Sequence, residues 1–181
     1  MKAVILFGSP RKSGNTRQLV DAFTGAMEKG RDEVKVLYLN DMKIKPCQGC
    51  LSCAETGACR IKDDMRDVCT SIMESDVVVY ATPIYWWAPS AQLKLAMDRS
   101  IVFLDGEMNS RVKGKKAVSL VTCADSDKET CAPTLEIFKR SFDGLGMEYS
   151  GHVEAVGCEE KGTASKKSRD AARSLAKSLL S

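Results

Sequence analysis

Five stretches of the chain have the apolar patterns expected of β-strands. The first, third and fourth are almost entirely apolar, which is typical of parallel strands that are buried on both faces of a sheet. Polar or glycine-containing segments separate each stretch from the next. The stretches are AVILF (residues 3–7), EVKVLYL (33–39), DVVVYATP (76–83), KAVSLVT (116–122) and MEYSGHVEAV (147–156).

Helical patterns occupy the segments between these strands. Their apolar residues recur every three or four positions, so each would present an apolar stripe on one side of a helix. A further connecting helix is expected, by its position, over residues 89–99. The four stripes are Leu19, Val20, Phe23 and Met27; Met65, Val68, Cys69, Ile72 and Met73; Leu135, Phe138, Phe142 and Leu145; and Ala172, Leu175, Ala176 and Leu179.

Strands that alternate with helices predict an α/β fold with a doubly wound parallel sheet. Five strands suit the flavodoxin-like order 2-1-3-4-5, with helices on both faces. Because 181 residues suffice for one sizeable core, we expect a single domain over residues 1–181, with a cysteine-rich loop insertion at about 43–64. Ligands of such sheets bind at the carboxyl ends of the strands. The loops after the first, third and fourth predicted strands therefore form the candidate site.

Composition narrows the class of protein. The chain is 44% hydrophobic and 28% charged, and it lacks an apolar run of the roughly 20 residues that cross a bilayer. The start MKAVILFGSP has neither the length nor the cleavage site of a signal peptide. A net charge of +3, spread along the chain, offers no footprint for nucleic acid or a membrane. Eight cysteines without a secretory signal favour reduced thiols, metal ligands or redox groups in the cytoplasm.

The segment GSPRKSGNT (residues 8–16) links the first predicted strand to a helix. Its hydroxyls, its backbone amides at a helix start and the charges of Arg11 and Lys12 indicate a phosphate site. Five residues separate its two glycines and no Lys-Ser/Thr follows, so it is not a Walker A loop, and G-x-G-x-x-G is absent. A plain helix cap is the structural alternative. We favour phosphate, because a cap alone does not need nine residues with an arginine.

The segment TPIYWWAPSAQLKLAMDR (residues 82–99) follows the third predicted strand. It places proline, isoleucine, tyrosine and two tryptophans beside the phosphate loop, which suits a ligand with a phosphate tail and a planar ring. The alternative is that Trp86 and Trp87 pack in a core or a subunit interface.

Four cysteines lie in the segment KIKPCQGCLSCAETGACRIKDDM (residues 43–65). Cys47, Cys50, Cys53 and Cys59 follow C-x2-C-x2-C-x5-C, and the first three match the spacing of ferredoxin-type [4Fe–4S] runs. We therefore predict that these four bind a cluster. Zinc suits the spacing less, because its structural sites usually take two cysteine pairs separated by a longer loop. A loop of reduced thiols without metal is the third interpretation.

The other residues with reactive side chains stand outside any motif. Cys69 lies on the apolar face of a predicted helix, and Cys131 and Cys158 are isolated along the chain, so we expect none of them to be a ligand. His152 lies in the fifth predicted strand and is expected to be structural. No side chain is assigned as a catalytic acid or base.

Together, the phosphate loop, the cysteine segment and the aromatic segment resemble the flavodoxin-fold NAD(P)H-dependent FMN reductase superfamily and, within it, the iron–sulfur flavoproteins. The resemblance covers roughly residues 1–125 with ordered motifs and the remainder only by its strand and helix pattern. It implies FMN, with the ring edge near the loop TCADSD (residues 122–127), where many members carry a glycine-rich turn that this chain lacks. The residues implied for the phosphate are Ser9, Arg11, Ser13, Asn15 and Thr16; for the ring, Pro83, Ile84, Tyr85 and Trp86; and for its edge, Thr122, Cys123 and Ala124.

The function implied is a cytoplasmic FMN oxidoreductase in which a [4Fe–4S] cluster links two-electron flavin chemistry to one-electron transfer. NAD(P)H is a candidate donor, the other partners are small-molecule or protein electron carriers, and a homodimer or homotetramer is expected. One alternative is a cluster-free NAD(P)H-dependent reductase of quinones, azo dyes or nitro compounds. A second is a non-enzymatic carrier that binds FMN and shuttles electrons between proteins.

Overall fold

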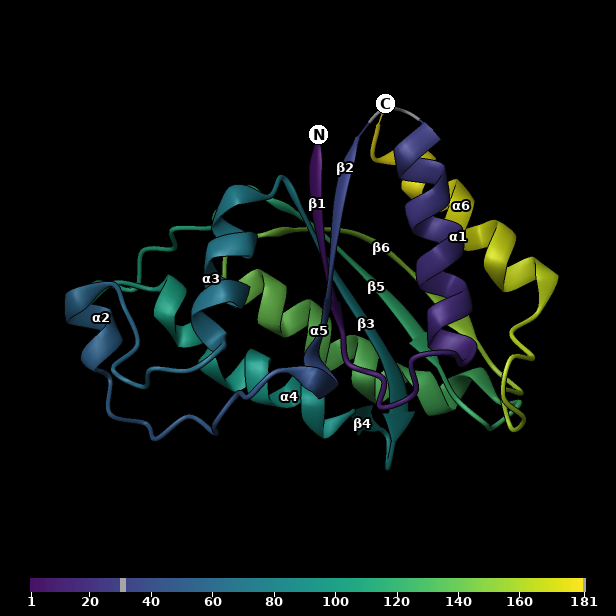
Figure 1. Ribbon diagram of the computed structural model, residues 1–181, viewed down its shortest axis with the longest axis horizontal. Helices are drawn as coiled ribbons and strands as arrows, with labels where there is room; N and C mark the ends of the chain where they lie inside the picture. Colours follow the sequence, from purple (N-terminus) through teal and green to yellow (C-terminus); the bar gives the residue numbers. More distant parts are fainter. Residues whose placement is uncertain (30–31, 181) are drawn as a thin grey trace.

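The buried apolar stretches form a twisted sheet that lies between two layers of helices (Figure 1). The computed structural model describes residues 1–29 and 32–180. Its parallel strands follow the order β2-β1-β3-β5-β6, which confirms the predicted order 2-1-3-4-5. These strands are β1 (Lys2–Phe7), β2 (Glu33–Tyr38), β3 (Val77–Tyr85), β5 (Lys116–Thr122) and β6 (Glu148–Ala155).

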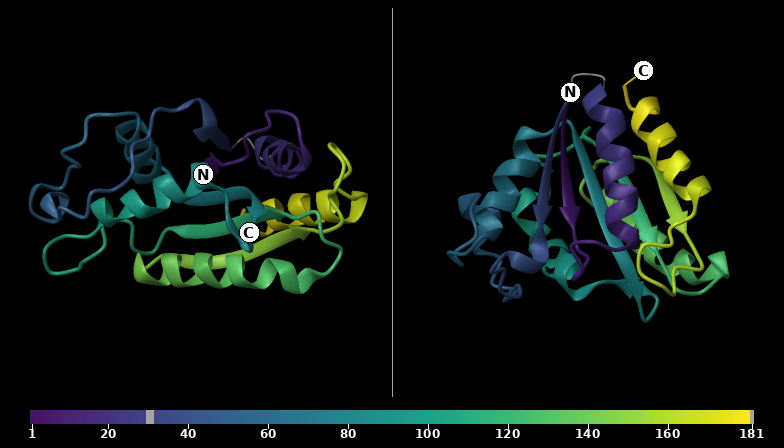
Figure 2. Two further views of the ribbon diagram at one scale, coloured as in Figure 1. Left: turned by 90° about the horizontal axis from the view of Figure 1, so that it is seen from below. Right: turned by 45° about the vertical axis from the view of Figure 1, so that its right-hand side comes forward.

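Alternate residues of each central strand enter opposite halves of the core. In β1, Ile5 and Phe7 pack with α1 and α6, whereas Val4 and Leu6 pack with α3, α4 and α5. This division explains why the stretch is apolar at every position. Figure 2 shows the two layers from further sides. The bounds are α1 (Asn15–Lys29) and α6 (Lys166–Ser178) on one face, and α3 (Met65–Glu74), α4 (Ala91–Asp98) and α5 (Ala132–Gly144) on the other.

The short elements lie in the connections. A five-residue helix, α2 (Ser52–Thr56), forms inside the cysteine segment, where no helix was expected. Three 3-10 turns accompany it: η1 (Leu39–Asp41), η2 (Arg99–Phe103) and η3 (Lys128–Cys131).

A two-residue strand, β4 (Ala88–Pro89), is an addition to the predicted sheet. It turns back antiparallel on the end of β3, with Ile84 opposite Pro89. Trp86 and Trp87 form the turn, with φ angles of 50° and 58°. Positive φ at both central positions is the requirement of a type I′ turn, which strongly favours Asn-Gly. Two tryptophans give no such signal, so the hairpin could not be predicted from its sequence.

Two boundaries differ from the predicted ones. The helix expected over residues 89–99 begins at Ala91, because the side chain of Ser90 accepts a hydrogen bond from the Leu93 amide and caps it. Arg99 belongs to the following 3-10 turn, and Pro89 to β4. In α3 the predicted apolar stripe is too wide, since Met73 is 44% exposed.

The arrangement of the elements separates three regions. The strands all end at one edge of the sheet, and the start of β1 and the end of α6 lie near the opposite edge (Figure 1). The cysteine segment lies at the end of the molecule away from α1 and α6 in all three views (Figures 1 and 2). Within the described ranges, none of the helices has the length and apolar character needed to span a bilayer.

Gly8 lies where the chain leaves β1 against the start of α4. Its amide donates to the Ala81 carbonyl at 2.8 Å, and its carbonyl accepts from Ser90 Oγ at 2.6 Å. A Cβ at this position would lie 2.7 Å from Leu93 Cβ and 2.9 Å from Ser90 Oγ, which is closer than such atoms approach. Glycine is therefore required by close packing between the first loop and α4.

We predict that Gly8→Ala lowers the free energy of unfolding by about 1–3 kcal/mol, because the added methyl group forces the loop away from α4. Gly25→Ala is the matched control. A Cβ at Gly25, in α1, would have no other atom within 4 Å, and alanine favours a helix over glycine by about 0.5–1 kcal/mol, so this variant should be stabilised. Urea denaturation of the two variants and wild type measures both effects, and equal midpoints would contradict the packing argument.

Candidate functional site

Three loops meet at the carboxyl edge of the sheet, as the sequence predicts. Thr16 Oγ1, at the start of α1, lies 2.8 Å from Thr122 Oγ1 at the end of β5, and the pair is buried. Ser90 Oγ, after the aromatic hairpin, donates to the carbonyl of Gly8 at 2.6 Å. These two hydrogen bonds hold the phosphate loop against both the aromatic loop and the end of β5.

Asn15 has a structural task that its place in the phosphate loop did not reveal. Its Nδ2 donates to the carbonyls of Cys158 and Glu160, at 3.2 and 2.7 Å, and its Oδ1 accepts from the Ala164 amide at 2.9 Å. The side chain thereby fastens the connection between β6 and α6 to the start of α1. Its backbone amide stays at the helix N-terminus, where amides have no partner within the helix.

The remaining residues of the phosphate loop divide by their exposure. Ser9 is buried, and its Oγ accepts from the Arg11 amide at 3.2 Å, whereas Ser13 is exposed. Lys12 forms an ion pair with Asp41 at 2.6 Å. The hydrogen bond to Asp41 raises the pKa of Lys12. Arg11 is exposed, and its guanidinium has no hydrogen-bonding or ionic partner among the described residues, so it is available to an anion.

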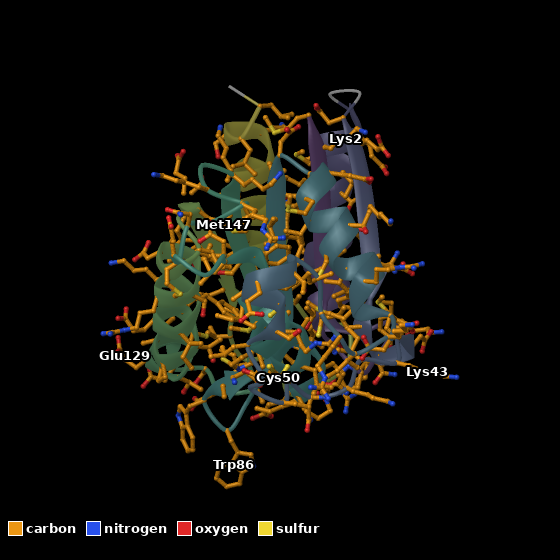
Figure 3. The ribbon with its side chains drawn as sticks, turned by 90° about the vertical axis from the view of Figure 1, so that its left-hand side faces the viewer. Lys2, Lys43, Cys50, Trp86, Glu129 and Met147 are labelled. Atoms are coloured by element: carbon orange, nitrogen blue, oxygen red, sulfur yellow. The ribbon has the colours of Figure 1, made fainter. Side chains whose placement is uncertain are left out.

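The aromatic hairpin projects from the fold. Trp86 is 87% exposed and Trp87 is 53% exposed, with ring centroids 5.8 Å apart. Figure 3 shows Trp86 extending beyond the end of the sheet. Packing of the tryptophans in the core of this chain, one of the alternatives, is therefore wrong. Thr134 Oγ1 of α5 donates to the Trp87 carbonyl at 2.9 Å and fixes the base of the hairpin.

The other expected ring contacts lie at different depths. Ile84 is buried, Pro83 is half-buried and Tyr85 is exposed. At the end of β5, Thr122 and Cys123 are buried, whereas Ala124 lies at the surface. The hydroxyl of Thr122 is buried and already makes one hydrogen bond, to Thr16.

A buried ion pair fastens the cysteine segment to the fold. Arg99 donates to Asp63 through both terminal nitrogens, at 2.9 and 3.1 Å, and to the Lys45 carbonyl at 2.9 Å. Asp63 also accepts from the amides of Lys45 and Met65, at 2.9 and 3.2 Å. Burial opposes ionisation of Asp63, but the Arg99 guanidinium and the two amides outweigh it and lower the pKa of the carboxyl.

The four motif cysteines face one small cavity. Its volume is about 30 Å³, and Arg99 and Ile101 are among the other residues that line it. In the described ranges no three Cys, His, Asp or Glu side chains are close enough together to hold a metal ion. Burial raises the pKa of the Cys53 thiol, and the neighbouring cysteines add to the effect. The cavity is lined by Cys47, Cys50, Cys53 and Cys59.

A second, larger cleft of about 850 Å³ lies between the cysteine segment and α3. Arg99 and Cys59 line both hollows, so they form the boundary between them. Apart from Arg99, which follows α4, the cleft includes no residue of the segments 8–16, 82–99 and 122–127. Cys69 also lines it, and burial raises the pKa of this thiol to about 11.

Cys131 and Cys158, which are isolated along the sequence, both lie next to Cys123 at the end of β5. Cys131 Sγ lies 3.5 Å from Cys123 Sγ, and the Cys158 amide donates to the Cys123 carbonyl at 2.9 Å. No motif has this spacing of cysteines, so the sequence does not reveal that these three residues are neighbours. His152 is exposed and its Nε2 lies 3.0 Å from Glu154 Oε1, in accordance with a structural role.

The comparison with protein families decides the affiliation. The family model described as NADPH-dependent FMN reductase matches residues 1–147. The chain belongs to this family. The expected resemblance is therefore confirmed, and the match includes the phosphate loop, the cysteine segment, the aromatic hairpin and the end of β5.

Relatives of this FMN reductase family member carry informative names. An iron-sulfur flavoprotein of Archaeoglobus fulgidus is 36% identical over 128 residues, which cover 71% of this chain and 57% of the relative. An iron-sulfur flavoprotein of Methanocaldococcus jannaschii is 37% identical over 119 residues, covering 65% and 62%. The match thus spans about three fifths of each of these relatives.

Among solved structures, an FMN-dependent NADH-azoreductase from Bacillus anthracis, in complex with FMN, superposes with a TM-score of 0.77. The alignment covers 100% of both chains at 15% sequence identity. At this identity the likeness establishes the flavodoxin-like fold alone.

The described residues fit FMN better than they fit a [4Fe–4S] cluster, the other cofactor that the family resemblance implies. The loop with its free Arg11 and the amides at the start of α1 suits a phosphate. The cysteine cavity has the donor chemistry for a [4Fe–4S] cluster, and the Nε of buried Arg99, which lacks a partner among the described residues, offers a hydrogen bond and positive charge there. Within the described ranges no three ligand-type side chains meet at one point, so the four cysteines would have to move closer together to hold a cubane.

We predict that Arg99→Ala lowers the free energy of unfolding by about 3–5 kcal/mol, because it leaves the carboxylate of Asp63 buried and unpaired. Arg140→Ala serves as the control, since it removes an exposed pair with Glu136 and should cost about 0.3–0.5 kcal/mol. Urea denaturation gives the energies, and limited proteolysis should show faster cleavage within residues 43–64 only in Arg99→Ala. Equal stability of the two variants would contradict the idea that the Arg99–Asp63 ion pair holds the cysteine segment on the fold.

Proposed function

We propose that this protein is an FMN-dependent oxidoreductase that takes electrons from NAD(P)H and passes them on through a [4Fe–4S] cluster. The observation that carries the proposal is the joining of three loops at one edge of the sheet, by the Thr16–Thr122 and Ser90–Gly8 hydrogen bonds. Membership of the FMN reductase family supports it.

The phosphate of FMN would bind in the loop between β1 and α1. Arg11 and Ser13 are exposed and would contact it through their side chains, with Ser9 at the base of the loop. Asn15 and Thr16 would contribute through their backbone amides, because their side chains are engaged elsewhere. A doubly charged phosphate is favoured at this position by the helix dipole as well as by the guanidinium.

The isoalloxazine ring would lie beside the aromatic hairpin. Half-buried Pro83 and buried Ile84 form an apolar floor, and Tyr85 and Trp86 provide exposed aromatic surface. Residues 122–124 would meet the ring edge, mainly through their backbone. FMN, when bound, supplies two-electron exchange with a nicotinamide, and the chain's own part is to position and tune the ring.

The cluster would bind to Cys47, Cys50, Cys53 and Cys59. Their common cavity and the free Nε of Arg99 support this assignment. Metal binding releases the thiol protons and is coupled to folding of the ligand loop, so we propose that the segment closes around the cluster as it loads. A bound cluster supplies one-electron transfer.

The cluster-free alternative has one observation in its favour. No three ligand-type side chains of the described ranges converge on a point, so the segment could remain a loop of reduced thiols. The protein would then be an NAD(P)H-dependent FMN reductase of small acceptors such as quinones. For both versions we propose a cytoplasmic homodimer or homotetramer that acts on small molecules or on protein electron carriers.

Purification without oxygen separates these functions. Flavin bands with a broad iron–sulfur shoulder are expected in the absorbance spectrum, and flavin bands alone would support the cluster-free reductase. Oxidation of NADH and NADPH is then followed with a quinone as acceptor. Turnover is expected, whereas a protein that binds FMN and does not oxidise either nicotinamide would be a carrier.

We predict that Arg11→Ala weakens FMN binding by about 1.5–3 kcal/mol, since a charge-assisted hydrogen bond to the phosphate is lost. Arg17→Ala is the matched control, because Arg17 lies in the first turns of the same helix but is paired with Asp21. Fluorescence titration with FMN measures both affinities. Unchanged affinity in Arg11→Ala would leave the backbone amides as the phosphate ligands.

We predict that Cys50→Ala eliminates bound iron and sulfide while FMN still binds, because the flavin loops lie outside the cysteine segment. Cys69→Ala should retain the cluster, since Cys69 does not line the small cavity. Iron and acid-labile sulfide are assayed in protein prepared without oxygen. Wild type with FMN but without iron would refute the cluster, and loss of iron in Cys69→Ala would show that Cys69 is a ligand.

A further inference from the structure

Two cysteine thiols outside the motif are in contact at the edge of the sheet where the three loops meet. Cys123 follows β5 directly, and Cys131 ends the 3-10 turn that precedes α5. Their sulfurs are 3.5 Å apart, and the side chains are 4% and 0% exposed. They differ from the motif cysteines in position, because they lie between the end of β5 and the start of α5 rather than in the segment after β2.

The two thiols are well placed to form a bond with each other. A disulfide has a sulfur–sulfur distance of about 2.0 Å, so the observed separation must shrink by about 1.5 Å for the bond to form. Cys158, the third cysteine nearby, is oriented otherwise. Its Sγ faces the carbonyl of Ala155 at 3.4 Å. The pair is therefore Cys123 with Cys131.

The surroundings decide which oxidants can act on the pair. Burial raises the pKa of both thiols, so each is protonated at neutral pH and must give up its proton as a disulfide forms, and bulky disulfides in solution have no access. The Cys123 amide donates a hydrogen bond to the Ala155 carbonyl at 3.0 Å. This bond holds Cys123 where β5 and its neighbour β6 end. A small electron acceptor bound over the end of β5 would therefore be the nearest oxidant for the Cys123–Cys131 pair.

We propose that Cys123 and Cys131 form a reversible dithiol/disulfide couple that gives two electrons to FMN bound at the strand ends. The proposal rests on the proposed function for its electron acceptor. Two S–H bonds would break and one S–S bond would form, and the two electrons and two protons would pass to the oxidised flavin, which would thereby be reduced. In the reverse direction the disulfide takes two electrons and two protons from the reduced flavin.

The first experiment tests the couple without flavin. Full-length protein is reduced, freed of reductant and FMN without oxygen, treated with a small excess of hydrogen peroxide, alkylated and cut with trypsin. Hydrogen peroxide takes up the two electrons and two protons as water. Because cleavage follows Lys116, Lys128 and Lys139, a disulfide would join peptide 117–128 to peptide 129–139 in the mass spectrum. We expect this linked pair to form and to disappear after dithiothreitol. Its absence overturns the proposal.

The second experiment adds the flavin. Reduced wild type is mixed with one equivalent of oxidised FMN per chain without oxygen, and we expect the same linked peptides together with loss of the yellow flavin absorbance. Cys131→Ser should abolish the link and most of the flavin bleaching, and Cys158→Ser, the matched control, should retain both. A link that persists in Cys131→Ser, or bound FMN that leaves the thiols intact in wild type, overturns the proposal.

The outcomes also separate this proposal from the proposed function. Wild type that does not bind FMN in a fluorescence titration refutes the flavin site, and with it the acceptor, even when peroxide forms the link. Wild type that binds FMN and oxidises NAD(P)H without forming the link in either experiment refutes only the dithiol couple.

Discussion

The cysteine segment depends for its position on the buried ion pair between Arg99 and Asp63. Arg99 is 2% exposed and also holds the carbonyl of Lys45, so both ends of the segment are attached to the end of α4. Removing one partner of such a pair leaves the other charge buried without a partner. Because this is strongly unfavourable, the pair holds the segment firmly. The same guanidinium borders the cavity that the four motif cysteines share. The placement of these thiols relative to the sheet therefore depends on this ion pair, together with the hydrogen bond that Arg111 donates to the Gly57 carbonyl at 2.8 Å.

The strand edge shows how a binding loop is built from side chains that serve the fold. Asn15 and Thr16 belong to a motif that indicates phosphate, but their side chains connect α1 to the segment before α6 and to β5. This leaves the backbone amides and Arg11 to face outward. Fixed side chains beneath a helix N-terminus hold its amides in one geometry, which is the preorganisation that anion binding needs.

Thiols occur in two different environments in this protein. The motif cysteines lie in an irregular segment around a small cavity, whereas Cys123 and Cys131 are held by the ends of regular elements. The first group has the freedom to rearrange around a metal cluster. The second has a fixed partner at 3.5 Å, which favours exchange between a dithiol and a disulfide over metal binding. If both proposals hold, the flavin exchanges electrons with two further redox centres.

The sequence by itself determined the five parallel strands, their order and the family, because strand and helix periodicities are local and the connections between parallel strands have a fixed hand. The cysteine motif was also visible, since its spacing is compact. Only the tertiary structure revealed the Trp86–Trp87 turn, the partners of Asn15 and the contact of Cys123 with Cys131. These features depend on packing between distant segments, which no local pattern of residues encodes.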